Sequence, residues 1–401
     1  MDMNQYRWQG YARANGLKGV RNKLLVVYTV ECSSFVARRI AEIAGGDAEV
    51  IGFHGCNDNA YAVRLLSALI RHPNVGAVLA VGLGCEYIQP AKLAEAARDE
   101  GKEAGWLFIQ EEGGTLRAIE KGVALARRLL DGLAATPRVA MGMADLVIGG
   151  ECGGSDYTSG LAGNVVVGRF FDLLVDAGGT AVFEEILEAI GIGHLLCERA
   201  AGRDAEAELR ATYDKALDYC KATRQYSISP GNFVGGLSSI EEKSMGAVIK
   251  SGSRPIQGVL KVGSRPPRPG LWLLDTTPDP HWMQYGIANP NDNEGLTALA
   301  ASGCHLLLFI TGRGNVVGNA VVPVVKVTGN ADTYARMIDD MDFNAGVTLT
   351  GECSQDNAAA ALARLVADTA GGALSKAEAM GHREYCIPYK YQEPAVSRCG
   401  R

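Results

Sequence analysis

Three features are missing from the 401-residue sequence, and each absence excludes a class of protein. No apolar run reaches the roughly 18 residues that a membrane-spanning helix needs. The first residues, MDMNQYRWQGYAR, lack the apolar core of a secretory signal. The Lys and Arg residues form no patch with interleaved aromatics, and the net charge is −6. We therefore expect a cytoplasmic protein that binds neither a membrane nor nucleic acid.

The ten cysteines contain no Cys-x-x-Cys pair, which argues against a structural zinc ribbon. In a cytosolic chain of this length, cysteines more often serve as free thiols or metal ligands than as disulfides. Glycine is abundant instead, with 50 residues, about twice its usual share. Many of these glycines follow apolar runs, which indicates tight turns where the backbone approaches a ligand closely.

Apolar runs rich in Val, Ile and Leu alternate with helical patterns in the first half of the chain. The runs lie at 24–30, 75–84, 105–109 and 144–150, and the second half repeats the style more weakly. Continuous apolar strands separated by helices predict parallel sheets covered on both faces. We predict a Rossmann-like α/β fold with mostly parallel sheets, helices on both faces and two domains. The first, 1–228, carries the Cys, His and Glu loops, and the second, 229–401, carries the SPGN, EEKS and TGRG loops.

Reactive side chains follow the apolar runs directly. Four of the ten cysteines occupy such positions, namely Cys32, Cys56, Cys85 and Cys152. Ligands of parallel α/β sheets bind beyond the carboxyl ends of the strands, and right-handed crossovers gather these loops at one edge. One cysteine at a strand end is most often a small buried apolar residue. Four in equivalent positions favour an enzyme site that holds a metal.

Thiolates, imidazoles and carboxylates at these loops suit iron or zinc. The candidate metal ligands are Cys56, Cys85, Glu86, Cys152 and Asp156. His54, in HGCNDN, titrates near neutral pH and is a candidate ligand, acid or base, with a purely structural role as the alternative.

The segment SPGNFVGGLSSIEEKSMG, 229–246, offers further catalytic candidates. Glu242 and Lys243 join His54 as candidate acid and base, in an order that the sequence leaves open. A Glu-Glu-Lys triplet at the start of a helix is usually a solvated first turn. A catalytic lysine would need burial or a charged partner to tune its pKa.

Two glycine-rich loops and the SPGN loop are candidates to bind the carboxylate of a substrate. In CGGSDYTSG, the backbone of Gly153, Gly154 and Ser155 can hold an anion, although its Ser and Asp residues also suit a helix N-cap. Asn232 of SPGN and Arg313 of GRGN are the other candidates, because a guanidinium grips carboxylates bidentately. GRGNVVG resembles a dinucleotide loop only weakly, since the segment after it is too short for a crossover helix.

Taken together, these stretches resemble the altronate/galactarate dehydratase family, also called the UxaA family. The matching segments are GYARANGLKGVRN (10–22), TVECS (29–33), HGC (54–56), HPNVGAVLAVGLGCE (72–86), GGT (113–115), ECGGSDYTSGLAGN (151–164), GGTAVFEE (178–185), SPGNFVGGLSSIEEKSMGA (229–247), LFITGRGN (308–315) and DDMDFNAG (339–346). The resemblance implies a lyase that removes water from a sugar acid such as altronate or galactarate and gives a 2-keto-3-deoxy acid. It also implies Fe²⁺ as cofactor, with Mn²⁺ as an alternative.

The family's sugar-acid enzymes usually carry a small N-terminal SAF domain, whereas here GYARANGLKG begins close to Met1. This arrangement is similar to the large subunit of (2R)-sulfolactate sulfo-lyase and implies a separate small SAF-domain subunit as partner. We also expect a homo-oligomer. The alternative reaction is then release of sulfite from sulfolactate to give pyruvate.

Both reactions begin with removal of a weakly acidic C2 proton beside a carboxylate. A divalent metal that chelates the carboxylate and the 2-hydroxyl would stabilise the resulting ene-diolate. An iron–sulfur cluster with three cysteine ligands and one open iron is a second possibility for the metal. Two rivals from other classes stay open: an NAD(P)-dependent oxidoreductase and a non-catalytic binding subunit.

Overall fold

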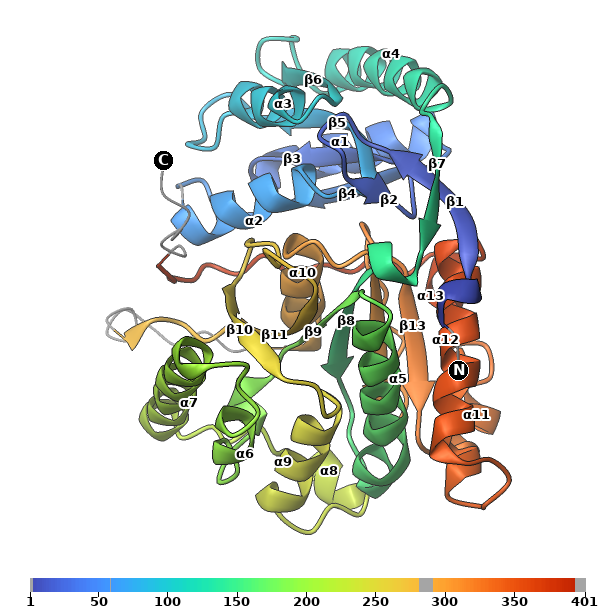
Figure 1. The fold of residues 1–401 in the computed structure, drawn as a ribbon. Coiled ribbons are helices and arrows are strands. Elements are labelled where there is room, and N and C mark those ends of the chain that lie inside the picture. Colours follow the sequence, from blue (N-terminus) through green and yellow to red (C-terminus); the bar gives the residue numbers. More distant parts are fainter. Residues whose placement is uncertain (1–2, 58, 281–290, 394–401) are drawn as a thin grey trace.

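The computed structural model describes residues 3–57, 59–280 and 291–393. Its elements form two parallel sheets covered by helices and one small antiparallel sheet between them (Figure 1). This confirms the predicted α/β class with mostly parallel sheets and helices on both faces. None of the described helices combines the length and the hydropathy needed to cross a membrane.

The smaller parallel sheet has four strands in the order β4-β3-β5-β6. Their bounds are β3 Lys23–Tyr28, β4 Ala48–Gly52, β5 Val75–Gly82 and β6 Glu103–Phe108. Successive side chains alternate between its faces, as the period of a strand requires. Leu24 and Val26 pack under α1 (Glu31–Ala44) and α4 (Thr115–Leu133). Leu25 and Val27 pack under α2 (Ala60–Ile70) and α3 (Pro90–Asp99) on the other face.

The larger parallel sheet has seven strands in the order β10-β11-β9-β8-β12-β13-β14. Their bounds are β8 Val147–Cys152, β9 Thr180–Phe183, β10 Ile256–Lys261, β11 Gly270–Asp275, β12 Leu306–Thr311, β13 Val324–Thr328 and β14 Phe343–Asn344. One face packs on α5 (Asn164–Asp176), α7 (Arg203–Thr223) and α12 (Gln355–Ala370). The other face packs on α10 (Asp292–Ala301), whose residues from Glu294 to Ala301 are all buried.

Shorter elements complete the chain. The short α-helices are α6 His194–Cys197, α8 Pro230–Val234, α9 Ile240–Ile249, α11 Ala331–Arg336 and α13 Lys376–Met380. The 3₁₀ turns are η1 Met3–Gln5, η2 Met143–Asp145, η4 Ile186–Glu188 and η6 Ala345–Thr348, and η3 (Ser159–Gly163) is a π-helical turn that leads into α5. Such π turns occur often at functional sites.

The antiparallel sheet β2-β1-β7 connects the two larger sheets. It consists of β1 Arg7–Ala12, β2 Lys18–Gly19 and β7 Arg138–Gly142, and β1 and β7 run side by side along one flank of the molecule (Figure 1). The chain passes through β7 from the smaller sheet to the larger one. The predicted division between 228 and 229 instead runs through the larger sheet, because β8 and β9 precede it and the other five strands follow it.

The two parallel sheets share one hydrophobic core. Helix α2 of the smaller sheet packs against α10 of the larger one, so that Leu65 and Leu69 belong to the same buried cluster as Leu296 and Leu299. Two buried histidines join the sheets just before the amino ends of strands, His72 before β5 and His305 before β12. His72 Nε2 bonds the carbonyl of Cys304 at 3.0 Å, and His305 Nε2 bonds that of Lys18 at 2.9 Å.

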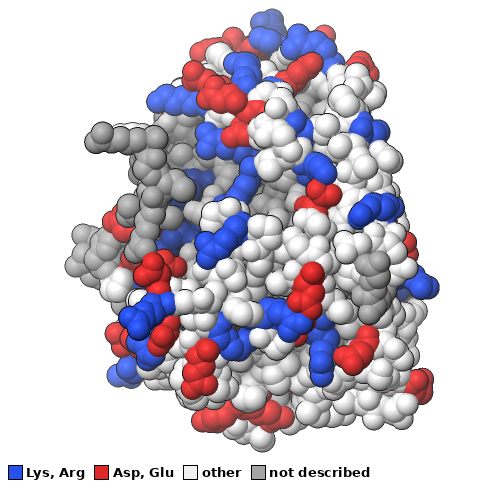
Figure 2. All heavy atoms as spheres, in the orientation of Figure 1, with Lys and Arg blue, Asp and Glu red and all other residues white. Residues whose placement is uncertain are grey.

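Charged side chains are mixed on the surface. On the face seen in Figure 2, the described Lys and Arg residues are interspersed with Asp and Glu, without a broad area of one sign. This agrees with the small net charge and gives no electrostatic footprint for nucleic acid on that face.

Candidate active site

The carboxyl edge of the larger sheet gathers polar side chains from neighbouring strands. Glu151 and Cys152 end β8, Glu184 and Glu185 follow β9, and Asp275 ends the adjacent β11. The strands are parallel, so these residues leave the sheet at the same edge. Each of the five is buried.

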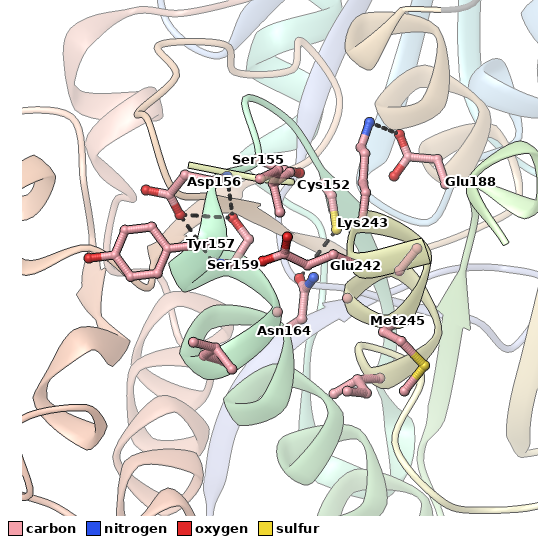
Figure 3. A pocket seen from close by; sticks show the side chains of 16 residues that line it. Cys152, Ser155, Asp156, Tyr157, Ser159, Asn164, Glu188, Glu242, Lys243 and Met245 are labelled. Atoms are coloured by element: carbon pink, nitrogen blue, oxygen red, sulfur yellow. Dashed lines mark hydrogen bonds and ion pairs between the residues drawn. The ribbon is translucent and has the colours of Figure 1, made fainter. Parts of the chain in front are cut away.

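A cavity of about 200 Å³ opens beside this edge, between the loop after β8 and helix α9 (Figure 3). It brings together five of the residues that the sequence predicted, namely Cys152, Ser155, Asp156, Glu242 and Lys243, with Asn164 and Glu188. Apolar side chains, among them Leu161, Leu237 and Met245, form much of the remaining wall. The predicted loops of ECGGSD and EEKS therefore lie on one cavity.

Glu188 connects this cavity to a smaller one of about 90 Å³, because it lines both. The smaller cavity is lined mainly by acidic side chains: Glu151, Glu184, Glu185, Glu188, Asp292 and Glu294. Lys243 donates a hydrogen bond to Glu188 Oε1 at 2.6 Å and another to the carbonyl of Ser227. The predicted catalytic lysine thus has the charged partner that such a role requires.

Three of these carboxyl groups lie close together. Glu151, Glu184 and Glu185 each place one oxygen within 4.8 Å of the others. Burial raises the pKa of Glu151 well above its ordinary value, and the neighbouring Glu184 adds to the effect. Burial also raises the pKa of Glu184 to about 7, against the hydrogen bond that it accepts from Thr276. Within the described residues, Oε2 of Glu151 is buried without a hydrogen-bond partner.

Lys250 supplies the positive charge beside this cluster. Its side chain is fully buried, forms an ion pair with Glu185 and donates to Cys152 Sγ at 3.4 Å. Glu185 also accepts the backbone N–H of Cys152 at 2.8 Å. Its φ of 74° is left-handed, a conformation that costs a non-glycine residue of order 1–3 kcal/mol. The ion pair and the backbone hydrogen bond hold this carboxylate in its strained position.

Cys152 lies where the cavity meets the carboxylates. Its thiol is within hydrogen-bond distance of Asn164 Oδ1, at 3.3 Å (Figure 3). Burial raises the pKa of this thiol, and the nearby Lys250 opposes the shift. Among the predicted metal ligands, Cys152 is the one that adjoins the three carboxylates.

Other predicted residues of this edge hold the loops together. Asp156 Oδ1 accepts from the Thr158 backbone at 2.8 Å and the Thr158 hydroxyl at 2.6 Å, and Oδ2 accepts from Asn330 at 3.0 Å. These bonds make Asp156 a cap of the following turn, which was the structural alternative for this residue. Asn232 donates to the carbonyl of Ser155 at 2.9 Å and is buried. It therefore fixes the SPGN loop to the CGGSD loop.

The remaining candidates for carboxylate binding are also engaged with the protein. The backbone N–H of Gly153 donates to Ile310 at 2.9 Å, and the carbonyl of Gly154 accepts from the Arg313 backbone at 2.9 Å. Gly154 has φ of 62°, which favours glycine at this turn. The guanidinium of Arg313 is exposed and donates to the carbonyl of Gly231 at 2.6 Å. Glu242, which was predicted as a catalytic acid or base, is engaged in a similar way. It accepts hydrogen bonds from the backbone and the hydroxyl of Ser238, both at 2.8 Å, at the start of α9.

Four predicted residues lie at the carboxyl edge of the smaller sheet instead. They are His54, Cys56, Cys85 and Glu86, which follow β4 and β5. The start of α2, next to the Cys56 loop, lies in the upper half of Figure 1, whereas β8 ends in the lower half near α8 and α9. The structure therefore does not gather the five predicted metal ligands in one site. Two separate parallel sheets each have a carboxyl edge of their own.

Glu86 has a structural role at that second edge. Its two oxygens accept from the Thr29 hydroxyl at 2.5 Å and from the backbone N–H groups of Leu83, Gly84 and Cys85 at 2.8–3.0 Å. Burial alone would raise the pKa of Glu86, but these hydrogen bonds, led by that of Thr29, lower it. A carboxylate so fully occupied has little left to offer a metal.

Four residues of this site were not among those predicted from the sequence: Glu151, Glu184, Glu185 and Lys250. The first three follow strands in the same way as the cysteines, in ADLVIGG-EC and TAVF-EE, so a signal for them was present. Lys250 had no such signal, because it belongs to the end of α9 and reaches the sheet edge only through the packing of that helix.

Comparison with known proteins identifies the class of this fold and site. The family model described as "D-galactarate/Altronate dehydratase, C-terminal" matches residues 143–393, and the model described as "D-galactarate dehydratase/Altronate hydrolase, second domain" matches residues 10–134. The two matches correspond to the larger and the smaller sheet. The chain therefore belongs to the galactarate/altronate dehydratase family, as the motifs predicted.

Three relatives illustrate the range of the family. An altronate dehydratase of Bacillus subtilis is 34% identical, over 95% of this chain and 77% of its own. A galactarate dehydratase (L-threo-forming) of Escherichia coli is 32% identical, over 92% and 73%. The (2R)-sulfolactate sulfo-lyase subunit beta of Chromohalobacter salexigens is 31% identical, over 98% and 100%.

Proposed function

We propose that this protein is a lyase that eliminates a β-substituent from a 2-hydroxy carboxylic acid with the help of a metal. The preferred reaction is dehydration of a sugar acid, such as altronate or galactarate, to a 2-keto-3-deoxy acid. The observation that carries the proposal is the trio of buried carboxylates at a sheet edge. The trio lines the cavity of about 90 Å³, which shares Glu188 with the cavity of about 200 Å³. The names of the dehydratase relatives support the same reaction.

The carboxylate trio fits the divalent metal that the family resemblance implies. Burial raises the pKa of Glu151 and of Glu184, and Lys250 pairs with Glu185 alone. Ionisation of all three carboxyl groups would therefore need further positive charge, which a divalent cation would supply. The unpartnered Oε2 of Glu151 is a free ligand atom. We propose that Glu151, Glu184 and Glu185 hold Fe²⁺ or Mn²⁺, since oxygen ligands suit such ions. When bound, the metal supplies Lewis-acid stabilisation of the negative charge that develops at the substrate carboxylate.

The proton transfers are assigned to the pair of Lys243 and Glu188. Glu188 lines both cavities, so its carboxylate can take the C2 proton of a substrate that lies between them. The ammonium of Lys243 can protonate the hydroxyl that leaves C3. The 2.6 Å hydrogen bond between the two then returns the proton from Glu188 to Lys243. One proton and one hydroxide leave the substrate, and water is released.

Sulfite release is the second candidate reaction. It is supported by the similarity to the sulfo-lyase subunit along nearly the whole of both chains. The first step is the same, because the C2 proton beside a carboxylate must again be removed. Sulfite leaves without needing a proton, so Lys243 would be less important.

We also propose partners and a location for the enzyme. The name of the sulfo-lyase relative, which is a subunit, supports a separate small subunit of the SAF type. A homo-oligomer and a cytoplasmic location complete the proposal. Co-purification of the tagged chain with the product of a neighbouring small gene, followed by light scattering, tests the assembly.

The reaction is tested with protein purified without oxygen, freed of metal and then supplied with Fe²⁺ or Mn²⁺. Altronate, galactarate and sulfolactate are compared, with 2-keto-3-deoxy acid, pyruvate and sulfite as products. Glu184→Gln should abolish turnover, whereas Glu352→Gln, at an exposed surface position, should not. Full activity in metal-free protein, or in Glu184→Gln, would overturn the proposal. Activity that needs the small subunit would support a shared site.

A further inference from the structure

Exposed cysteines occur at one place in the described part of the chain. Of the nine cysteines there, only Cys32, Cys56 and Cys85 are exposed, and the others are buried or half-buried. Cys32 lies in the first turn of α1 after β3, Cys56 follows β4, and Cys85 follows β5. The strand order β4-β3-β5 makes these three strands neighbours. All the exposed thiols of the described residues therefore converge on the carboxyl edge of the smaller sheet.

The backbone that carries these thiols is held by hydrogen bonds between the loops. The Glu31 N–H donates to the carbonyl of His54 at 3.4 Å, and the Tyr87 N–H donates to the carbonyl of Cys56 at 3.0 Å. The buried carboxylate of Glu86 binds three successive N–H groups around Cys85. The three loops thus form one connected surface at this edge.

We propose that Cys32, Cys56 and Cys85 bind an iron–sulfur cluster, at a site separate from the carboxylate trio. Thiolates select iron–sulfur clusters, zinc or copper(I) among biological metals. Adjacent strands lie about 4.8 Å apart, so thiols on three neighbouring strands span more than the width of one ion. Among the described residues, no three possible ligands at this edge come within 4.8 Å of one another, as those of a single ion do in the carboxylate trio. A cluster of several irons bridges such a span.

The stoichiometry leaves one iron open. Each of the three thiols gives up its proton, and each sulfur binds one iron of the cluster. Ferrous and ferric iron together with inorganic sulfide supply the rest, so the assembly needs no separate oxidant. A fourth iron would have no cysteine ligand, and it would face the exposed surface that also carries His54.

Anaerobic reconstitution of the full chain with ferrous and ferric iron and sulfide tests the site directly. We expect several irons and a similar number of inorganic sulfides per chain, with the broad visible absorbance of sulfide-to-iron charge transfer. Cys32→Ser, Cys56→Ser and Cys85→Ser should each lose most of this signal. Cys353→Ser, a half-buried thiol on the other sheet's side, should keep all of it. Glu151→Gln should keep it as well, which separates this site from the proposed reaction.

Alkylation gives a second readout that does not depend on variants. After reconstitution, peptide mapping should find Cys32, Cys56 and Cys85 protected from iodoacetamide, and removal of iron should expose all three. Iron without inorganic sulfide, stoichiometric zinc, or equal cluster content in the Cys→Ser variants would overturn the proposal. Unchanged alkylation at the three thiols would overturn it too.

Discussion

Both parallel sheets place reactive side chains at their carboxyl edges, but these side chains are exposed at one edge and buried at the other. The smaller sheet presents thiols that are exposed to solvent. The larger sheet presents carboxylates that are buried, with Lys250 as their buried counter-charge. Side chains at an exposed edge can bind a bulky group from solvent, whereas a buried edge strengthens the interactions between the charges that it contains. In both sheets, the position directly after a strand determines where reactive side chains gather. The elements that cover this position determine whether the side chains are exposed or buried, and therefore which ligands they can bind.

The largest expected effect tests whether the metal proposed for the elimination reaction binds only at the buried edge of the larger sheet. Glu151→Gln removes a ligand atom from the trio, so the affinity for Mn²⁺ should fall by at least about 100-fold, as even outer partners of metal ligands contribute roughly 10- to 100-fold. Cys85→Ser should leave it unchanged. Anaerobic calorimetry with Mn²⁺ measures both. Equal losses in the two variants would show that the edges form one site.

The second-largest expected effect is a difference in unfolding free energy between variants at the two edges. Lys250→Met leaves the buried carboxylate of Glu185 without its partner, which costs about 3–5 kcal/mol of unfolding free energy. Cys85→Ser changes an exposed side chain and should stay within about 0.5 kcal/mol. Urea unfolding of the metal-free proteins measures the difference. Excess Mn²⁺ should restore part of the loss in Lys250→Met, and a loss below 1 kcal/mol would contradict the assigned ion pair.

Acid should loosen the junction between the two regions. In both His72 and His305, Nδ1 accepts a backbone N–H at 3.0 Å, so protonation there breaks a buried hydrogen bond. Burial, reinforced by the neighbouring His305, lowers the pKa of His72 well below its ordinary value, and burial lowers that of His305 to about 4. The unfolded chain therefore binds protons first. The stabilisation is complete above about pH 6.5 and is lost as the pH falls toward 4, by about 1.4 kcal/mol per unit for each histidine.

Unfolding free energies measured between pH 4 and pH 8 test this junction. His305→Asn should reduce the slope by about 1.4 kcal/mol per pH unit and leave the contribution of His72, even if it lowers stability throughout. His194→Asn, at an exposed position, is the matched control and should keep the wild-type slope. A His305→Asn protein with an unchanged slope would place the acid sensitivity elsewhere.

The smallest effect concerns a residue that the sequence offered as catalytic. Glu242 accepts two hydrogen bonds from Ser238 at the start of α9, so Glu242→Gln should cost only about 0.5–1 kcal/mol. Turnover should fall less than tenfold, in contrast to Lys243→Met. Comparison of kcat in the two variants decides the matter. If kcat falls as much in Glu242→Gln as in Lys243→Met, Glu242 takes part in catalysis.

The sequence predicted the fold class and the family, but it could not show which loops lie at the carboxyl edge of the same sheet. Strand and helix patterns are local, so the alternation of apolar runs and helices was sufficient for the class. Which strands share a sheet depends on long-range pairing: β8 follows β7 in the chain yet pairs with β9 and β12. For that reason Cys56 and Cys152 were placed in one site although they belong to two sheets.

The roles of individual side chains were harder to predict than their positions. Asp156 and Glu86 were selected as metal ligands because of their residue type and place, but both carboxylates are filled by nearby N–H and hydroxyl groups. Glu184 and Glu185 had the same place after a strand and were passed over in favour of cysteines. Only burial and hydrogen bonding separate a carboxylate that caps a turn from one with a free oxygen.

The packing of α2 on α10 has a mechanical consequence. Helix α2 begins directly after the Cys56 loop, and the first turn of α10 borders the carboxylate cavity through Asp292 and Glu294. Their contact lies within one continuous cluster of buried side chains, and close-packed interiors transmit displacement rather than absorb it. A ligand that shifts α2 at one edge must therefore move α10 or strain it. Any resulting change in affinity would be reciprocal, so the two edges can act as an allosteric pair.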